Sequence, residues 1–310
     1  MLLPSLVFSL VAACALWITL RKNPAGNPRA SGLVLTLLLI LPILGFVPKY
    51  SVTVSDSVSQ DPPSLLIPYL WLAGFALFSL KGLRDLLAIQ KWRRQSLPAP
   101  DLTLFHETLE QLKVRQKVSL QLHPRLNSPV VAGILRPTVY LPKSSSQWSP
   151  ETLRMAVLHE LGHIQRRDLW MASLAHLACL LHWFNPAVWW LRRTFLAQCE
   201  FACDAHLVQH GANPRTYAHA LCDVAQSAAA PPLSLAMAGH VPLRERIICL
   251  SERQKRGSVF LSSLILLTAA SATAASLVRF VPKLDIAPPL PEEVVEENQL
   301  RFQANPFPGD

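Results

Sequence analysis

Charged side chains are scarce in this sequence. Asp, Glu, Lys and Arg make up 16% of its 310 residues and hydrophobic residues make up 51%, whereas soluble domains carry roughly 25% charged residues. No internal repeat is present, and the six cysteines include no C-x-x-C pair, so a structural zinc knuckle is not indicated. Mean hydropathy is +0.28. This composition favours an integral membrane protein, provided that the apolar residues are clustered.

Four segments contain no charged side chain at all, namely residues 1–20, 31–48, 64–80 and 258–278. Each is close to the roughly 20 residues that a helix needs to cross the hydrocarbon core of a membrane. The first segment has no basic residue before it, and Arg21 and Lys22 follow it, which favours a membrane anchor over a cleaved signal peptide. We therefore predict a mainly α membrane protein with four transmembrane helices.

The charges that flank these segments predict their orientation. The first loop holds basic residues without an acid, and five basic residues follow the third span, namely Lys81, Arg84, Lys91, Arg93 and Arg94. Because basic residues concentrate on the cytoplasmic side, we expect three spans within residues 1–83, a cytoplasmic domain over 84–257, a fourth span over 258–278 and an extracytoplasmic, acidic, Pro-rich tail over 279–310. The protein would then lie in the inner (cytoplasmic) membrane as a multi-pass protein.

The net charge of +9 follows from this arrangement, since the basic residues flank the spans and form no separate patch. We therefore expect the lipid bilayer as a partner and no direct contact with nucleic acid. The cysteines of the predicted cytoplasmic part should stay reduced in that compartment.

The predicted cytoplasmic domain combines short helices with short strands. Hydrophobic patterning predicts helices over residues 102–114 and 197–210, a strand over 118–122 and two strands within 129–142. A further helix begins at Ser149 and Pro150, residue types that favour a helix cap and a first helical position, and is expected to run to about Asp168. The hairpin at 130–142 could take up a substrate by strand addition or simply cover the domain.

The chemistry is concentrated in the sequence His159-Glu160-Leu161-Gly162-His163. Residues four apart on a helix lie on one side of it, so the two histidines can bind a single zinc ion (Zn2+). Glu160 lies beside that face, where it can act as general base. Zinc lowers the pKa of a bound water, the glutamate takes its proton, and the hydroxide attacks a carbonyl carbon. The five-residue pattern alone is a weak indication, because it also occurs in unrelated proteins.

A third zinc ligand is available on the helix predicted over 197–210. Glu200 and Asp204 lie four residues apart and therefore on one face of it. Glu200 would complete a His-His-Glu site, and Asp204 would accept a hydrogen bond from a ligand imidazole. The alternative is an exposed acidic pair, but the neighbouring residues are apolar, and unpaired carboxylates among them would be costly.

The uncharged run over residues 169–191 tests the predicted topology. It is long enough to cross a membrane, but a full crossing would separate Glu200 from the two histidines, and one ion could not then bind all three. We therefore expect a helical hairpin broken at Asn185 and Pro186. It is either re-entrant in the membrane or part of the core of the domain.

Other side chains carry weaker indications. His206 and His210 have ligand spacing, but His206 faces away from the predicted glutamate ligand on the helix, which favours an ordinary structural role. Tyr217 could stabilise an oxyanion. Cys199 and Cys203 could offer thiolates, although small buried hydrophobic residues are the commoner role of such cysteines.

Several segments resemble the MecR/BlaR-type family of membrane zinc peptidases. They are HELGHIQRRD, WFNPAVWWLRR and CEFACDAHL, with SPVVAGILRPTVYLP before them and PLRERI after them. The resemblance covers about residues 1–280. It implies a gluzincin-like α+β zinc-peptidase domain in which His159, His163 and Glu200 bind zinc and Glu160 is the general base. The best-known members cleave themselves or a repressor in the cytoplasm, in response to an external β-lactam.

The end of the chain departs from this pattern. Those members carry a penicillin-binding sensor domain after the fourth span, whereas only about thirty residues, rich in proline and acid, follow Val278. We therefore expect no β-lactam sensing by this segment.

The resulting functional hypothesis is an integral-membrane zinc endopeptidase with its active site on the cytoplasmic side. Its substrate would be a cytoplasmic protein, either a transcriptional repressor or the chain itself, in an antirepressor type of signal transduction; a homodimer is left open. One alternative is a membrane quality-control peptidase of the HtpX type, against which PVVAGILRP and WFNPAVWW argue. An intramembrane site-2-type protease fits less well, because Arg166, Arg167 and Asp168 place the motif at an aqueous edge. The other alternative is a non-catalytic receptor that retains zinc.

Overall fold

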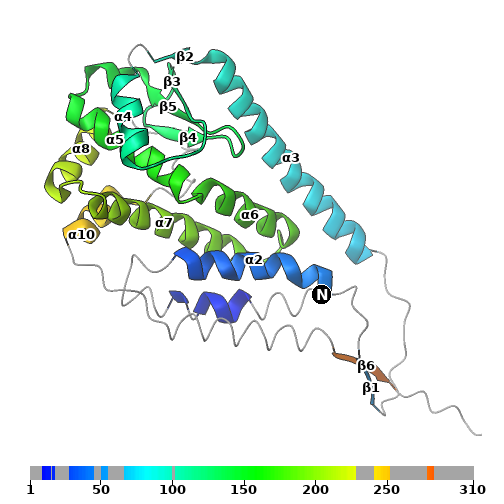
Figure 1. Cartoon of the computed structure of the whole chain (residues 1–310). Helices are drawn as coiled ribbons and strands as arrows, with labels where there is room; N and C mark the ends of the chain where they lie inside the picture. Colours follow the sequence, from blue (N-terminus) through cyan, green and yellow to red (C-terminus); the bar gives the residue numbers. More distant parts are fainter. Residues whose placement is uncertain are drawn as a thin grey trace, which may run out of the picture. The chain divides into compact units, whose positions relative to one another are not determined.

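A computed structural model of the chain describes residues 9–14, 16–17, 28–44, 50–54, 66–99, 102–227, 241–251 and 278–282. Its helices are α2 (Pro28–Leu44), α3 (Leu66–Gln95), α4 (Thr103–Gln111), α5 (Pro150–Gln165), α6 (Asp168–Leu181), α7 (Pro186–Gln209), α8 (Pro214–Ser227) and α10 (Leu243–Ser251), with a 3-10 helix η1 (Lys143–Gln147). Its strands are β1 (Tyr50–Val54), β2 (Leu97–Pro98), β3 (Ser119–His123), β4 (Val130–Ala132), β5 (Thr138–Pro142) and β6 (Val278–Pro282) (Figure 1).

The chain forms two compact units. The larger comprises residues 1–47 and 65–276, and the smaller comprises 48–64 and 277–310. In the smaller unit β1 and β6 pair in parallel, with Tyr50 opposite Val278. The candidate site lies in the larger unit.

The larger unit contains a four-stranded sheet in the order β2-β3-β5-β4. β3 and β5 pair in parallel, while β2 and β4 run antiparallel to their neighbours at the two edges. The predictions of a strand near 118–122 and of two strands within 129–142 are confirmed. The turn between β4 and β5 requires Gly133, whose φ is +95° and where an added Cβ would lie 2.6 Å from the Arg136 carbonyl oxygen.

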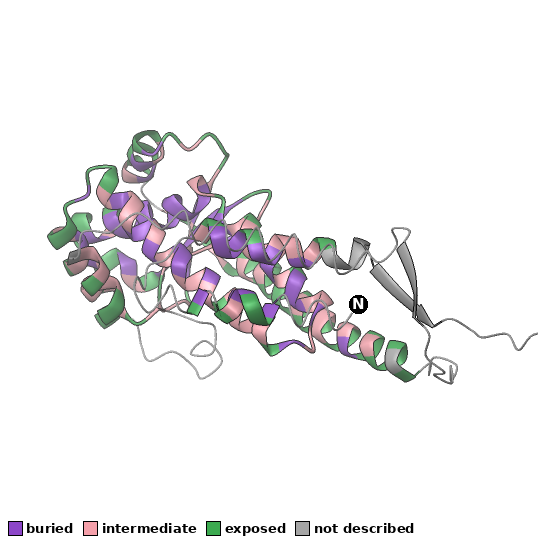
Figure 2. Ribbon diagram, turned by 90° about the horizontal axis from the view of Figure 1, so that it is seen from below, coloured by how far each residue is buried: buried purple, intermediate pink, exposed green. Residues whose placement is uncertain are grey.

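Helix α5 begins as its sequence predicts. The Ser149 hydroxyl accepts a hydrogen bond from the Thr152 amide at 3.1 Å, and Pro150 takes the first helical position. The helix ends at Gln165, earlier than predicted, because Arg167 adopts a left-handed conformation with φ of 61° and α6 begins directly after it. α5 packs against α4, α7, α8 and the strands β4 and β5, so it lies in the interior of the larger unit, where the buried residues gather (Figure 2).

Helix α7 joins two apolar clusters. Its first half packs with α2 and α6, around buried residues such as Leu35, Ala178 and Leu191. Its second half packs with α4, α5, α8 and the sheet, around residues such as Leu161 and Leu207. The site residues of α7 follow directly after the first cluster.

The predicted hairpin over 169–191 consists of α6 and the start of α7. Its break at Asn185 and Pro186 is confirmed. The Asn185 side chain accepts a hydrogen bond from the Ala187 amide at 3.1 Å, and Pro186 is the first residue of α7. The helix predicted over 197–210 therefore begins eleven residues earlier than its hydrophobic pattern indicated.

The prediction of four transmembrane helices is wrong. Among the residues that the structure describes, no helix is both long enough and apolar enough to cross a membrane. α2 has 17 residues and buries apolar side chains against α6 and α7, beside which it runs in Figure 1. α3 has 30 residues, but its second half is rich in charged side chains. The expected spans over 1–20 and 258–278 lie largely outside the described residues.

Candidate metal centre and active site

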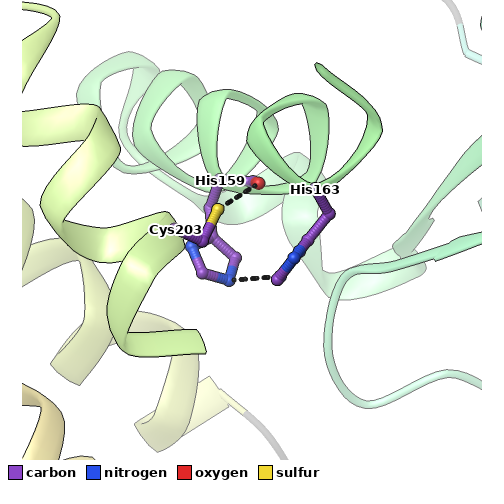
Figure 3. Close-up of side chains that lie close together, drawn as sticks. All are labelled: His159, His163 and Cys203. Atoms are coloured by element: carbon purple, nitrogen blue, oxygen red, sulfur yellow. Dashed lines mark hydrogen bonds between the residues drawn. The ribbon is translucent and has the colours of Figure 1, made fainter. Parts of the chain in front are cut away.

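The two imidazoles of α5 face each other. His159 and His163 are both buried, and their Nε2 atoms lie 3.2 Å apart (Figure 3). The ring planes are nearly perpendicular, at 85°. The helical spacing of four residues therefore brings two nitrogens that could bind a metal to one point, as the sequence predicts.

Glu200 brings a carboxylate from α7 to the same point. Its Oε2 lies 3.3 Å from His159 Nε2 and its Oε1 lies 3.4 Å from His163 Nε2. A tetrahedral zinc ion with bonds of about 2.0–2.1 Å holds its ligand atoms about 3.3 Å apart. The three side chains therefore fit a single zinc ion. Burial alone would raise the pKa of Glu200, but the two imidazoles beside it hold it well below its ordinary value.

The far nitrogen of His163 is held by the carboxylate of Asp168, which sequence spacing did not place at the site. His163 Nδ1 lies 2.9 Å from Asp168 Oδ2, and Arg166 holds the same carboxylate through Nε at 3.1 Å and Nη2 at 3.3 Å. Because the carboxylate accepts, the Nδ1 nitrogen carries the proton and leaves the lone pair of Nε2 free for a metal. Asp168 follows the His motif in HELGHIQRRD, which is the one indication that the sequence offers.

The far nitrogen of His159 is held by Tyr217 and Asp204. The Tyr217 hydroxyl donates to Asp204 Oδ1 at 2.6 Å, so its oxygen accepts from His159 Nδ1 at 2.8 Å. Asp204 Oδ1 itself lies 3.3 Å from His159 Nδ1. Burial alone would raise the pKa of Asp204, but the hydrogen bonds from Arg246 and His159 lower it to about 2. Here too the ring proton is on Nδ1 and the Nε2 lone pair is free.

Glu160 lines the cavity into which the three candidate ligands open. The cavity measures about 360 Å³. Its wall includes Val130 and Val131 of β4, and small or aliphatic side chains of α5, α6, α7 and α8 line much of the rest. Burial raises the pKa of the Glu160 carboxyl above its usual value, against the lowering effect of the two imidazoles. A raised pKa suits a carboxylate that accepts a proton near neutral pH.

Cys203 offers a second donor set. His159, His163 and Cys203 could hold a metal ion, since one donor atom of each lies within 4.8 Å of the others. However, the Cys203 thiol donates to the His159 carbonyl oxygen at 3.2 Å, as Figure 3 shows. A thiolate, the form that binds metal, would face that carbonyl oxygen unfavourably. The closeness of α7 to α5 is the reason for this contact, since a Cβ on Gly162 would lie 2.7 Å from the sulfur.

The weaker candidates lie in other settings. His206 Nε2 contacts Gln165 Oε1 at 2.5 Å, and the rings of His206 and His210 pack together at 4.1 Å, so neither belongs to the metal centre. Cys199 lines the cavity, and burial raises the pKa of its thiol. Tyr217 is 1% exposed, with its hydroxyl committed to the residues that hold the first imidazole.

Arg246, which lies on α10 within the PLRERI segment, also belongs to the site, although no sequence pattern indicated it. Its Nη2 binds Asp204 Oδ1 at 2.5 Å, and its Nη1 lies 3.5 Å from Glu200 Oε2. The residue is 42 positions beyond Asp204 in the sequence. Only the tertiary fold brings it to the site.

Two helix-borne imidazoles, a carboxylate from a second helix and a glutamate beside the first histidine form the arrangement of a metallopeptidase centre. The sequence profile described as BlaR1 peptidase M56 matches residues 48–250, which is more than half of the chain and includes every residue of the site. The chain belongs to the BlaR1 peptidase M56 family. The resemblance found in the sequence is thereby confirmed at the level of the family.

Curated relatives agree with this assignment. The chain is 31% identical to "Regulatory protein BlaR1" of Bacillus licheniformis over 164 residues, which cover 52% of this chain and 27% of that protein. It is 25% identical to "Methicillin resistance mecR1 protein" of Staphylococcus aureus and of Staphylococcus epidermidis over 109 residues, which cover 32% of this chain and 19% of each relative. The chain thus matches about a quarter of the length of these relatives, or less.

Proposed function

We propose that this protein is a zinc endopeptidase in which His159, His163 and Glu200 bind the ion. The observation that carries the proposal is the convergence of His159 Nε2, His163 Nε2 and the Glu200 carboxylate at 3.2–3.4 Å from one another. With the ring protons held on Nδ1, two lone pairs and a carboxylate at this distance repel unless a metal ion or further protons lie between them. The thiol of Cys203 is the less suitable third donor, because it is engaged with a backbone carbonyl.

Each residue of the cavity then has a separate role in the reaction. When bound, zinc supplies a Lewis acid that polarises a carbonyl and lowers the pKa of a water molecule. The Glu160 carboxylate accepts a proton from the attacking water and returns it to the nitrogen of the leaving amine. Asp168 and the Tyr217–Asp204 pair keep both imidazoles oriented with Nε2 towards the ion.

The position of β4 supports an extended peptide as substrate. β4 lies at an edge of the sheet, and Val130 and Val131 line the active-site cavity. A substrate strand can therefore pair with its free edge while it passes the metal centre. Its side chains would meet the aliphatic wall of the cavity, formed by residues such as Leu169, Leu196 and Leu221.

We further propose that residues 84–257 form the peptidase domain and that its substrate is a cytoplasmic protein, either a repressor or the chain itself. This part of the proposal is supported by the family and by the edge strand β4 beside the cavity. We place it at the cytoplasmic side of the inner membrane, and contact with the membrane is supported by the exposed apolar side chains of α3, namely Leu66, Tyr69, Leu70, Leu72, Leu77, Leu80, Leu83, Leu86 and Leu87. Such a surface favours contact with lipid and requires no described helix to cross the bilayer.

Two substitutions test the enzyme assignment on the purified full-length protein. Glu160→Gln should retain zinc and lose cleavage of a proteome-derived peptide library, because the amide cannot accept the proton. Glu200→Ala should lose most of the bound zinc, as measured by mass spectrometry of the metal. Glu107→Gln is the matched control, since this glutamate is exposed on α4 and should change neither property.

The outcomes separate the alternatives. Cleavage by Glu160→Gln would show that the general base is a different residue. A wild-type protein that binds zinc but cleaves no peptide or protein would fit the non-catalytic receptor. Unchanged zinc in Glu200→Ala would direct attention to Cys203 as third ligand.

A further inference from the structure

Arg246 is the one arginine or lysine among the described residues that line the active-site cavity. Two of its nitrogens bind the Asp204 carboxylate side by side, Nε to Oδ2 at 2.8 Å and Nη2 to Oδ1 at 2.5 Å. Nη2 also donates to the Tyr217 hydroxyl at 3.1 Å. Paired bonds to a buried carboxylate fix the plane and position of a guanidinium group. This side chain, 15% exposed, is therefore held in place before any substrate binds.

The same guanidinium lies over the face of the first ligand imidazole. Arg246 Nη2 is 3.4 Å from both Nδ1 and Nε2 of His159. A nitrogen at this equal distance within the ring plane would collide with the Cε1 atom between them, so Nη2 lies above the ring. Nη2 therefore approaches both ring nitrogens from the face of the imidazole and not along the in-plane lone pair of Nε2.

The remaining nitrogen, Nη1, faces the metal ligands. It lies 3.5 Å from Glu200 Oε2, which is too long for a strong hydrogen bond. Because Nε and Nη2 are used in the bonds to Asp204 and Tyr217, the N–H groups of Nη1 are the ones that can donate to a molecule in the cavity. They lie beside Glu200 in the cavity that the three candidate ligands share.

We propose that Arg246 is a catalytic residue of this peptidase, whose Nη1 donates to the carbonyl oxygen of the bond being cleaved. The proposal rests on the proposed function. As the water oxygen bonds to the carbonyl carbon, the electron pair of the C=O bond moves to that oxygen, which becomes negatively charged. The C–N bond then breaks, and the amine leaves with the proton that Glu160 took from water. Arg246 stays protonated throughout and lowers the energy of the charged intermediate.

The structure favours Arg246 over Tyr217 for this role. Oxyanion stabilisation is the role the sequence suggested for Tyr217, but its hydroxyl donates to Asp204 and accepts from His159. It has no proton left for a substrate oxygen. The guanidinium has donors on one side anchored by Asp204 and donors on the other side facing the cavity, which a lysine ammonium at this position could not reproduce.

The test compares two inhibitors with the same peptide sequence on the zinc-loaded full-length protein. A phosphinic peptide carries two oxygens that imitate the charged intermediate, while a thiol peptide binds the metal through sulfur alone. Arg246→Gln and Arg246→Lys should weaken the phosphinic peptide about 100-fold, leave the thiol peptide within a few-fold, and lower kcat about 10²- to 10³-fold with little change in KM. Arg244→Gln, an exposed arginine on the same helix, is the matched control and should leave all values unchanged.

Each other outcome overturns the assignment. Equal weakening of both inhibitors, or loss of zinc from both Arg246 variants while the wild type is loaded and active, would mean that Arg246 only positions Asp204 and His159. A wild-type protein that binds neither zinc nor inhibitor would refute the proposed function and the role of Arg246 together. Thermal unfolding of each variant shows whether it still folds. If Arg246→Gln does not fold, Arg246→Lys, which keeps the positive charge, provides the test.

Discussion

Each imidazole of the candidate metal centre is held at its far nitrogen by an oxygen that accepts a hydrogen bond from it. For His163 the acceptor is Asp168, and for His159 it is the Tyr217 hydroxyl, whose own proton goes to Asp204. These two arrangements fix the same tautomer by different means. The charged acceptor, Asp168, should hold its imidazole more strongly than the Tyr217 hydroxyl does, because hydrogen bonds to an ionised group are roughly twice as strong as neutral ones.

This difference gives a prediction for Asp168→Asn. The asparagine side chain keeps the shape but loses the charge that holds the proton on His163 Nδ1, so zinc affinity should fall about 10- to 100-fold. Competition against a chelator of known affinity measures the change. Asp85→Asn, at an exposed position on α3, is the control. Unchanged zinc affinity in Asp168→Asn would mean that Arg166 and the packing around it orient the ring without the carboxylate charge.

Residue types and spacing along two helices were enough to predict that the three candidate ligands come together. His159, His163 and Glu200 come together as their positions on two helices indicate. Asp168 and Arg246 could not be predicted in the same way. Asp168 reaches its partner only because the chain turns at Arg167, and Arg246 arrives from a helix whose placement no local pattern specifies.

At the scale of elements, the site depends on how closely α5 and α7 pack. Gly162 lies in this contact: an added Cβ would lie 2.7 Å from Cys203 Sγ and 3.2 Å from Leu207 Cδ1. The sulfur is fully buried and has little room to move. A side chain at position 162 therefore has to push the two helices apart.

We expect Gly162→Ala to destabilise the protein by about 1–3 kcal/mol through overpacking, despite the better helix propensity of alanine. It should also weaken zinc binding, because Glu200 on α7 moves away from the histidines on α5. The double variant Gly162→Ala, Cys203→Ala removes the sulfur that the new methyl group meets and should recover much of the zinc affinity. Urea unfolding and zinc titration of the single and double variants measure both effects.

A double variant no better than Gly162→Ala alone would contradict this account of the contact. If Cys203→Ala alone abolished zinc binding, the sulfur would instead be a ligand. The same pair of substitutions therefore tests the packing and the choice of third donor.

Element boundaries were predictable where local chemistry decides them. Ser149 with Pro150, and Asn185 with Pro186, each begin a helix in the structure. The prediction of four transmembrane helices failed because the length of an uncharged segment does not show what its side chains pack against. Apolar side chains of α2 pack against α6 and α7, and the apolar half of α3 continues directly into a charged half.

At the scale of the larger unit, a bound metal ion would connect helix α5 with the long helix α7. α5 supplies His159 and His163, and α7 supplies Glu200 from the point where its two apolar clusters meet. An ion that binds only the folded arrangement stabilises it by mass action. Folding and zinc binding should therefore be coupled in this protein.

Removal of zinc should lower the unfolding temperature of the wild type and leave Glu200→Ala almost unaffected. At free zinc about 100 times its dissociation constant the ion contributes about 2.7 kcal/mol, which for a unit of this size corresponds to roughly 5–10 °C. Scans with and without a chelator, followed by addition of zinc in excess, measure the shift and its reversal. Cys203→Ala should show the same shift as the wild type, because its sulfur donates to the His159 carbonyl oxygen. An equal shift in Glu200→Ala, or none in Cys203→Ala, would instead assign the third bond to sulfur.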